Sequence, residues 1–265
     1  MRAYKSMLAA ALMALPVAAQ ADGMKGACCA EEKTVYSHMM FGAIDVSKDA
    51  WQSHSGIIIA FNRDLSKDGF LFRSYGSYGQ YEYPVGFEGT EWQGDVMLGY
   101  QWVRNNVDIS LSAGVDYINH RIRPFDALNP VQGREWGFKV AGDIETRTFA
   151  LNLPYYFLLD ADYSTAFDSY YVLSRLGAHR NNFVFGVEGW LFGDESGDAQ
   201  RLGAFAMWER SVRPDLLMDI TLSGGYQFSD DSGGSSSGQY AAEGAYARLD
   251  LTFFFGDRRQ NKPLK

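Results

Sequence analysis

The sequence predicts an all-β protein: a single antiparallel up-and-down transmembrane β-barrel of about 12 strands that follows a cleaved signal peptide. Three observations lead to this prediction. The first residues have the order of a secretory signal, and the rest of the chain alternates apolar and polar residues with a period of two. No later stretch approaches the roughly 18 consecutive apolar residues of a transmembrane helix. Aromatic residues, which favour strands, make up 15% of the chain, and only 7 residues are Pro.

The N-terminal segment begins with the basic residues Arg2 and Lys5, continues with an apolar run, and ends in small residues at Ala21. This order is typical of a signal peptide, here over residues 1–21. The apolar run is too short for a bilayer of about 30 Å, which disfavours an uncleaved anchor helix. We expect residues 22–35 to form a periplasmic segment. It contains Cys28 and Cys29, for which a vicinal disulfide, intermolecular pairing and free thiols all remain open.

Five segments alternate cleanly. In one of them, the odd positions from Val107 to Tyr117 are apolar, while the even positions from Asp108 to Asp116 are polar or Gly. Successive side chains on a strand point to opposite faces, so a barrel in lipid places its apolar set outside and its polar set inside. The five segments are 95–102, 107–117, 135–145, 218–228 and 248–255.

Seven further segments alternate less regularly and fill the gaps between these five. They are 36–46, 51–62, 69–81, 155–164, 168–179, 182–193 and 199–210. The total of twelve is even, as single-chain bacterial barrels require. Short turns rich in Arg, Asn and Asp are then expected at 63–68, 104–106, 180–182 and 211–215, and external loops at 82–90, 120–132, 194–198 and 229–242.

Aromatic residues near the strand ends are candidates for the two rings of aromatic side chains that flank the lipid face of such barrels. They are Trp51, Tyr81, Trp92, Trp102, Tyr117, Phe192, Trp208, Tyr226 and Phe228.

The predicted barrel covers residues 36–255, and a polar tail over 256–265 follows it. A soluble β-sandwich or a lipocalin-like barrel would also alternate. It is disfavoured because a soluble fold normally avoids a second face with this many charges beside exposed aromatic rings. The formal net charge of −8 argues against nucleic acid as a partner, since binding to phosphates needs clustered Lys and Arg.

Six short strings, taken in order, resemble the BcsS family of cellulose-biosynthesis outer-membrane proteins. The resemblance extends over most of the chain, from Phe41 to Phe255, and implies an accessory protein of a bacterial cellulose synthase system at the outer membrane. It implies outer-membrane lipid as surroundings and cellulose and cellulose synthase subunits as partners, but it brings no catalytic motif. The strings are Trp92–Gln101, Gly114–Tyr117 with Asn119 and His120, Glu135–Lys139, Ser164–Tyr170, Asp198–Gly203 and Arg213–Leu216.

The inward positions carry charges of both signs, and a lumen of about twelve strands is narrower than that of the largest porins. In one interpretation these charges pair with one another and fill the barrel, because buried charges must be paired. In the other, they contact the hydroxyls of a neutral glucan, while rings such as Tyr171 and Phe205 stack on its sugars. The lumen candidates are Asp160, Asp162, Arg175, Glu188, Trp190, Arg201 and Arg248.

We expect no enzyme, no catalytic residue, no metal ligand and no cofactor. A barrel lipase or deacylase would need a Ser-His pair, but the serines that flank His54 lie on the opposite face of its strand. The histidines are expected to be solvated residues at strand ends. Asp160 and Asp162 lie two positions apart on one face, a spacing open to the two acids of a glycosidase, but the segment is otherwise typical of an ordinary strand. A general small-solute porin is the main alternative function.

Overall fold

The computed structural model describes residues 34–83, 86–127, 129–146, 153–229 and 243–258, and they form twelve strands and one short 3-10 helix, η2 (Ala166–Asp168). The strands are β1 (Thr34–Ser47), β2 (Ala50–Ala60), β3 (Gly69–Tyr83), β4 (Phe87–Arg104), β5 (Val107–Arg123), β6 (Gly133–Thr146), β7 (Tyr155–Ser164), β8 (Tyr170–Arg180), β9 (Phe183–Asp194), β10 (Gly197–Arg213), β11 (Leu216–Ser229) and β12 (Gly244–Arg258).

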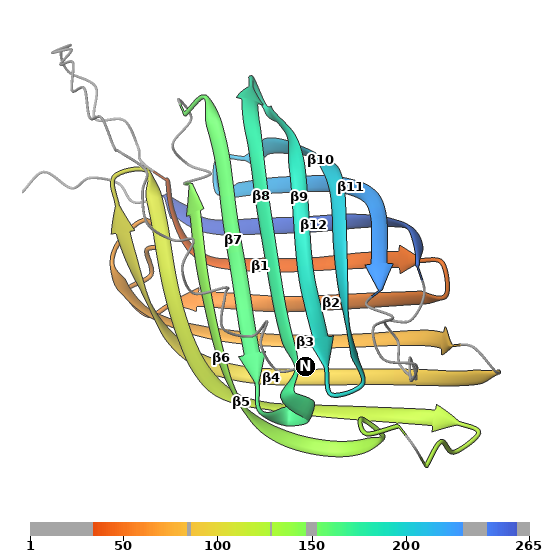
Figure 1. Cartoon of the computed structure of the whole chain (residues 1–265). Helices are drawn as coiled ribbons and strands as arrows, with labels where there is room; N and C mark the ends of the chain where they lie inside the picture. The colour runs from red at the N-terminus through yellow and green to blue at the C-terminus, as the bar shows by residue number, and fades with distance from the viewer. Residues whose placement is uncertain (1–33, 84–85, 128, 147–152, 230–242, 259–265) are drawn as a thin grey trace, which may run out of the picture. The chain divides into compact units, whose positions relative to one another are not determined.

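The strands form one closed antiparallel barrel in which each strand pairs with its neighbours in sequence and β1 pairs with β12 (Figure 1). Ala43 of β1, for example, lies opposite His54 of β2 on one side and opposite Asp250 of β12 on the other. The predicted up-and-down barrel of twelve strands is therefore confirmed. Within the described residues, no helix has the length and the apolar character needed to cross a membrane.

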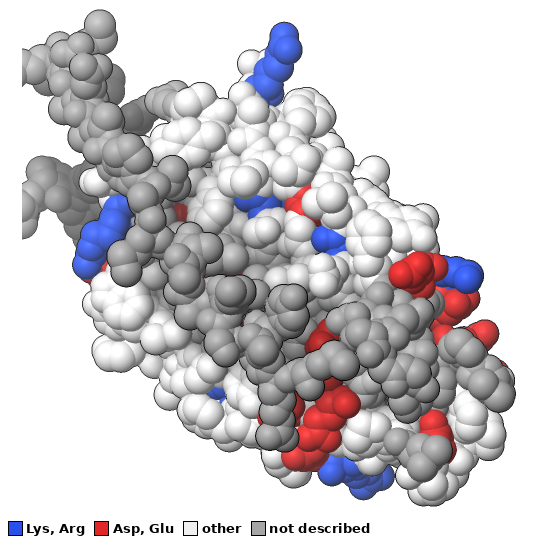
Figure 2. Space-filling view, viewed as in Figure 1, with Lys and Arg blue, Asp and Glu red and all other residues white. Residues whose placement is uncertain are grey.

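The two faces of the strands show the predicted alternation. On β5, Leu111 and Val115 expose 57% and 54% of their surface, whereas the inward Ser112 and Asp116 expose 3% and 1%. This distribution is the reverse of that in a soluble domain, where apolar side chains fill the centre. Uncharged residues accordingly predominate on the face seen in Figure 2, where charged side chains gather in small groups.

Two of the aromatic residues expected on the outer face point inward instead. Tyr81 is buried against Ile122, and Phe192 lines the interior cavity. Trp92, Tyr226 and others of that set are exposed, as predicted. Aromatic residues occur on both faces of β3 and β9, so their identity alone does not reveal which face they occupy.

Two of the tight turns follow directly from the sequence. Asn105 and Asn181 have positive φ angles of 51° and 58° and form the two-residue connections β4–β5 and β8–β9. A two-residue turn whose twist matches that of the strands needs this backbone conformation, and Asn tolerates it better than most residues.

The longer connection between β2 and β3 folds inward across the end of the barrel. The Gln101 side chain donates hydrogen bonds to the carbonyls of Leu65 and Lys67, at 2.8 and 2.7 Å, and the Leu65 amide donates to the Tyr36 carbonyl. Leu65 thereby enters an apolar cluster with Phe254 of β12. The segment that the sequence predicts as a short turn at 63–68 therefore narrows this end of the lumen.

The connection between β7 and β8 narrows the opposite end. Phe167 of η2 packs against Ile118 and Val131, and its carbonyl accepts a hydrogen bond from the Glu195 amide at 3.0 Å.

The predicted loop at 120–132 is too long, because β5 continues to Arg123. Arg123 lies opposite Glu88 of β4 in the sheet, and opposite charges in such cross-strand pairs stabilise the pairing.

Some predictions lie wholly or partly outside the described residues: the signal peptide at 1–21, the cysteines Cys28 and Cys29, most of the loop at 229–242, and the tail beyond residue 258. Residues 256–258 of the predicted tail belong to β12.

Candidate binding site in the barrel lumen

The inward faces of the strands enclose a cavity of about 400 Å³. Its wall includes His120 and Phe167 toward one end and Asp219 and Phe254 toward the other. Small-molecule sites typically have volumes of about 300–1,000 Å³, so the cavity is large enough for a small polar ligand.

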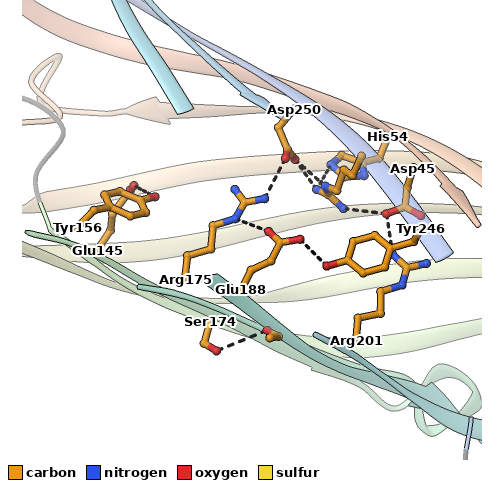
Figure 3. Close-up of polar contacts among 12 residues, drawn as sticks. Asp45, His54, Glu145, Tyr156, Ser174, Arg175, Glu188, Arg201, Tyr246 and Asp250 are labelled. Carbon is orange, nitrogen blue, oxygen red and sulfur yellow. Dashed lines mark hydrogen bonds and ion pairs between the residues drawn. The ribbon is translucent and has the colours of Figure 1, made fainter. Parts of the chain in front are cut away.

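One part of the wall consists of charges that are fully paired. Arg175 of β8 contacts Glu188 of β9 at 2.9 Å and Asp250 of β12 at 3.0 Å, and Asp250 also contacts Arg248 at 2.6 Å (Figure 3). Asp250 thus receives two guanidinium groups. Because β8 and β12 are not neighbours in the sheet, the Arg175–Asp250 contact joins side chains from separate parts of the barrel.

The same network continues through Asp45, Arg201 and Tyr246. Arg201 of β10 contacts Asp45 of β1 at 2.7 Å, and its Nε donates to the side chain of Gln227 at 2.9 Å. The Tyr246 hydroxyl donates to Glu188 at 2.8 Å. We refer to this set as the paired wall, and it comprises Asp45, Arg175, Glu188, Arg201, Tyr246, Arg248 and Asp250.

A second part of the wall, which we refer to as the open wall, is less completely paired. Lys139 of β6 contacts Asp95 at 3.1 Å and Asp162 at 3.2 Å. Arg73 of β3 interacts electrostatically with Asp160 and three other carboxylates, but no ion pair joins it to any carboxylate in the described part of the chain. The open wall comprises Arg73, Asp95, Lys139, Asp143, Asp160 and Asp162.

Several buried polar atoms that belong to residues lining the cavity have no hydrogen-bond partner among the described residues. They include Nε of Arg73, Oδ1 of Asp160 and the indole Nε1 of Trp190. The Cζ atom of Arg248 lies over the Trp190 ring, 4.6 Å from the ring centroid. The rings of Trp190 and Tyr171 form a T-shaped contact with their centroids 5.5 Å apart. Two donors and one acceptor on the cavity wall are thus left unsatisfied beside two aromatic rings.

The seven predicted lumen candidates all lie on the inner side of the barrel. Arg175, Glu188, Arg201 and Arg248 belong to the paired wall, and Asp160 and Asp162 belong to the open wall. Trp190 lies against Arg248 of the paired wall and packs against Tyr171. Six of the seven line the cavity, and Glu188 lies within the wall with 1% of its surface exposed.

Sequence reasoning missed Asp45, Arg73 and Tyr246. Asp45 lies between Ile44 and Val46, and Arg73 follows Phe72. A single charge next to apolar residues in a strand was the signal for both, since such a charge must face the polar side. Tyr246 gave no comparable signal.

The expectation that the histidines are solvated is wrong for His54 and His120. His54 lines the lumen, and its Nε2 lies 3.3 Å from a guanidinium nitrogen of Arg248. His120 is buried, 3.3 Å from the Tyr81 hydroxyl and against the Phe167 ring. Both were expected near strand ends, but β2 and β5 extend beyond them. No group of three or more potential metal ligands occurs among the described residues.

Comparison with family models matches residues 39–255 to the family described as cellulose biosynthesis protein BcsS. No curated protein matches the chain.

Several solved structures share its general architecture. A KdgM porin in complex with disordered oligogalacturonate is 9% identical, with a TM-score of 0.40, 82% of this chain and 98% of that chain covered. The β domain of the Bordetella autotransporter BrkA is 10% identical (TM-score 0.48, 84% and 100% covered). LpxR from Salmonella typhimurium is 11% identical (TM-score 0.46, 83% and 100% covered). Similarities at this level concern the fold and not the function.

Proposed function

The chain belongs to the BcsS family of cellulose biosynthesis proteins, and on that premise we propose that it is an outer-membrane barrel that contacts the glucan in its lumen during cellulose production or export. The observation that carries the proposal is the inverted distribution of side chains. Apolar residues such as Leu111 and Leu222 cover the outside, while many charged and polar side chains line the cavity inside. A lipid bilayer is the surroundings that suits such an exterior, because acyl chains solvate apolar side chains.

The charge distribution of the lumen suits a neutral polysaccharide. In the paired wall, three arginines face three carboxylates, so this wall has no formal net charge to attract or repel an ion. Side-chain groups of this kind can still exchange hydrogen bonds with sugar hydroxyls. A barrel whose cross-section is fixed by ion pairs can act either as a conduit for the glucan or as a scaffold that holds it.

The role we propose is non-enzymatic. The His54 imidazole, the group a Ser-His hydrolase could have used, is hydrogen-bonded to Arg248 instead of to a serine. The contact of His54 with Arg248 therefore supports a non-enzymatic role.

The proposal is tested in cells by deleting the gene and then restoring it with the wild-type chain. We expect to find the protein in the outer-membrane fraction. We also expect deletion to lower extracellular cellulose and the restored gene to recover it. Unchanged cellulose after deletion would falsify the cellulose role. Single-channel conductance with and without cello-oligosaccharide separates this role from that of a general porin, because a porin for small solutes would conduct ions equally in both conditions.

A further inference from the structure

Among the described residues, four that line the cavity have a buried polar atom without a hydrogen-bond partner: Arg73, Asp160, Trp190 and, toward one end, Asp219. Arg73 Nε and Trp190 Nε1 are donors, and Asp160 Oδ1 is an acceptor. Leaving a buried polar group without a hydrogen bond costs about 1–3 kcal/mol. Such groups are normally satisfied, by the protein, by water or by a ligand.

The atoms of Arg73, Asp160 and Trp190 belong to one continuous part of the wall. Asp160 of β7 and Trp190 of β9 both lie opposite Leu173 of the intervening β8. Tyr171 of β8 packs against Trp190, with ring centroids 5.5 Å apart, and Arg73 interacts electrostatically with Asp160. The residues that line the same cavity include Arg73, Asp160, Tyr171 and Trp190. A single ligand in that cavity can therefore approach all of them.

We infer that Arg73, Asp160, Tyr171 and Trp190 form a binding subsite for an uncharged sugar ring. This inference rests on the proposed function and specifies where in the lumen the glucan is held. A sugar hydroxyl both donates and accepts hydrogen bonds, so neighbouring hydroxyls can satisfy Asp160 as well as Arg73 and Trp190. The partly buried Tyr171 ring supplies the apolar surface that ligand pockets combine with a few polar groups.

The charge of the open wall argues against an acidic sugar. Two cations, Arg73 and Lys139, face four carboxylates, and Lys139 is already bound to two of them. A uronate would bring a further negative charge next to this excess of carboxylates, and like charges at short range repel strongly in a low-dielectric interior. The subsite therefore favours a neutral glucan over a polyuronate.

Binding of cellohexaose to the purified full chain in detergent tests the inference, with isothermal titration calorimetry as the measurement. Trp190→Phe keeps an aromatic ring but removes the indole donor, and Asp160→Ala removes the acceptor. We expect Asp160→Ala to weaken binding by about tenfold or more, because it removes a charged acceptor, and Trp190→Phe to weaken it by less than about tenfold, because the indole donates to a neutral hydroxyl. Asp160→Asn keeps one acceptor oxygen and should give an intermediate loss.

The matched control is Ser223→Ala. The Ser223 hydroxyl is also buried without a partner, but Ser223 does not line the cavity, so its removal should leave binding unchanged. Unheated electrophoretic mobility shows that each variant has folded. Oligogalacturonate serves as the acidic probe and should bind at least tenfold more weakly than cellohexaose.

Each outcome bears on the subsite separately from the cellulose role. If the wild type binds cellohexaose and the two variants bind it equally well, the subsite is wrong, although the proposed function stands. If the wild type binds no cellohexaose while gene deletion lowers cellulose, water alone satisfies these atoms and the subsite is again wrong. Equal affinity for oligogalacturonate would overturn the preference for neutral sugars.

Discussion

The two walls of the lumen bury charge in different ways. On the paired wall, every arginine has a carboxylate within about 3 Å, and the contacts connect β8 with β12 and β10 with β1. On the open wall, Arg73 forms no such contact with a described carboxylate, and Asp160 keeps one oxygen without a partner. The difference indicates that the two walls have different roles. The paired wall fixes the cross-section of the barrel, and the open wall is available to a ligand.

The strongest test of this comparison is the same substitution on each wall. Asp250→Asn removes the carboxylate shared by Arg175 and Arg248 and leaves two buried guanidinium groups with less compensation. Breaking one partner of a buried ion pair typically costs about 3–5 kcal/mol. We expect a loss of this size in the free energy of unfolding, measured by urea titration of the barrel in lipid with tryptophan fluorescence.

Asp160→Asn is the matched change on the open wall. We expect it to lower the free energy of unfolding by less than about 1 kcal/mol, the range of an ordinary point mutation. Asp160 loses its attraction to Arg73, but its repulsion by Asp143 and Asp162 disappears at the same time. Equal losses for Asp250→Asn and Asp160→Asn would show that both walls are structural and would remove the distinction between them.

A smaller effect is expected from removing the Tyr246 hydroxyl of the paired wall, with removal of the Tyr171 hydroxyl as the control. Tyr246→Phe removes the hydrogen bond that Glu188, with 1% of its surface exposed, receives at 2.8 Å. A hydrogen bond to a charged group is worth about 1.5–3 kcal/mol, so the urea midpoint should fall by a corresponding amount. Tyr171→Phe is the control, because no hydrogen bond of the Tyr171 hydroxyl is found in the described part of the chain. An equally large fall in the urea midpoint for Tyr171→Phe would contradict the distinction between the paired wall and the open wall.

The sequence predicts the barrel better than the lumen, for a physical reason. The alternation seen from Val107 to Tyr117 is local, so strand number and facing follow from neighbouring residues. The contact between Arg175 and Asp250 joins residues 75 positions apart and depends on how the barrel closes. Inward facing was predictable for each charge, but its partner was not. The folding of Leu65 and Phe167 over the two ends also depends on contacts with distant strands.

The smallest expected effect on the free energy of unfolding comes from removing a buried hydroxyl that has no hydrogen-bond partner. Ser223 of β11 is buried, and its hydroxyl has no partner; Ser164 of β7 is also buried, but its hydroxyl donates to Asp116 at 2.8 Å and accepts from the Ala166 amide at 2.9 Å. Ser223→Ala should change the free energy of unfolding by no more than about 0.5 kcal/mol, whereas Ser164→Ala should lower it by about 1–3 kcal/mol because Asp116 loses its donor. Urea titration of both variants measures the difference. If Ser223→Ala were as costly as Ser164→Ala, ordered water would be satisfying the apparently unpartnered atoms, and the open wall would need no ligand to explain it.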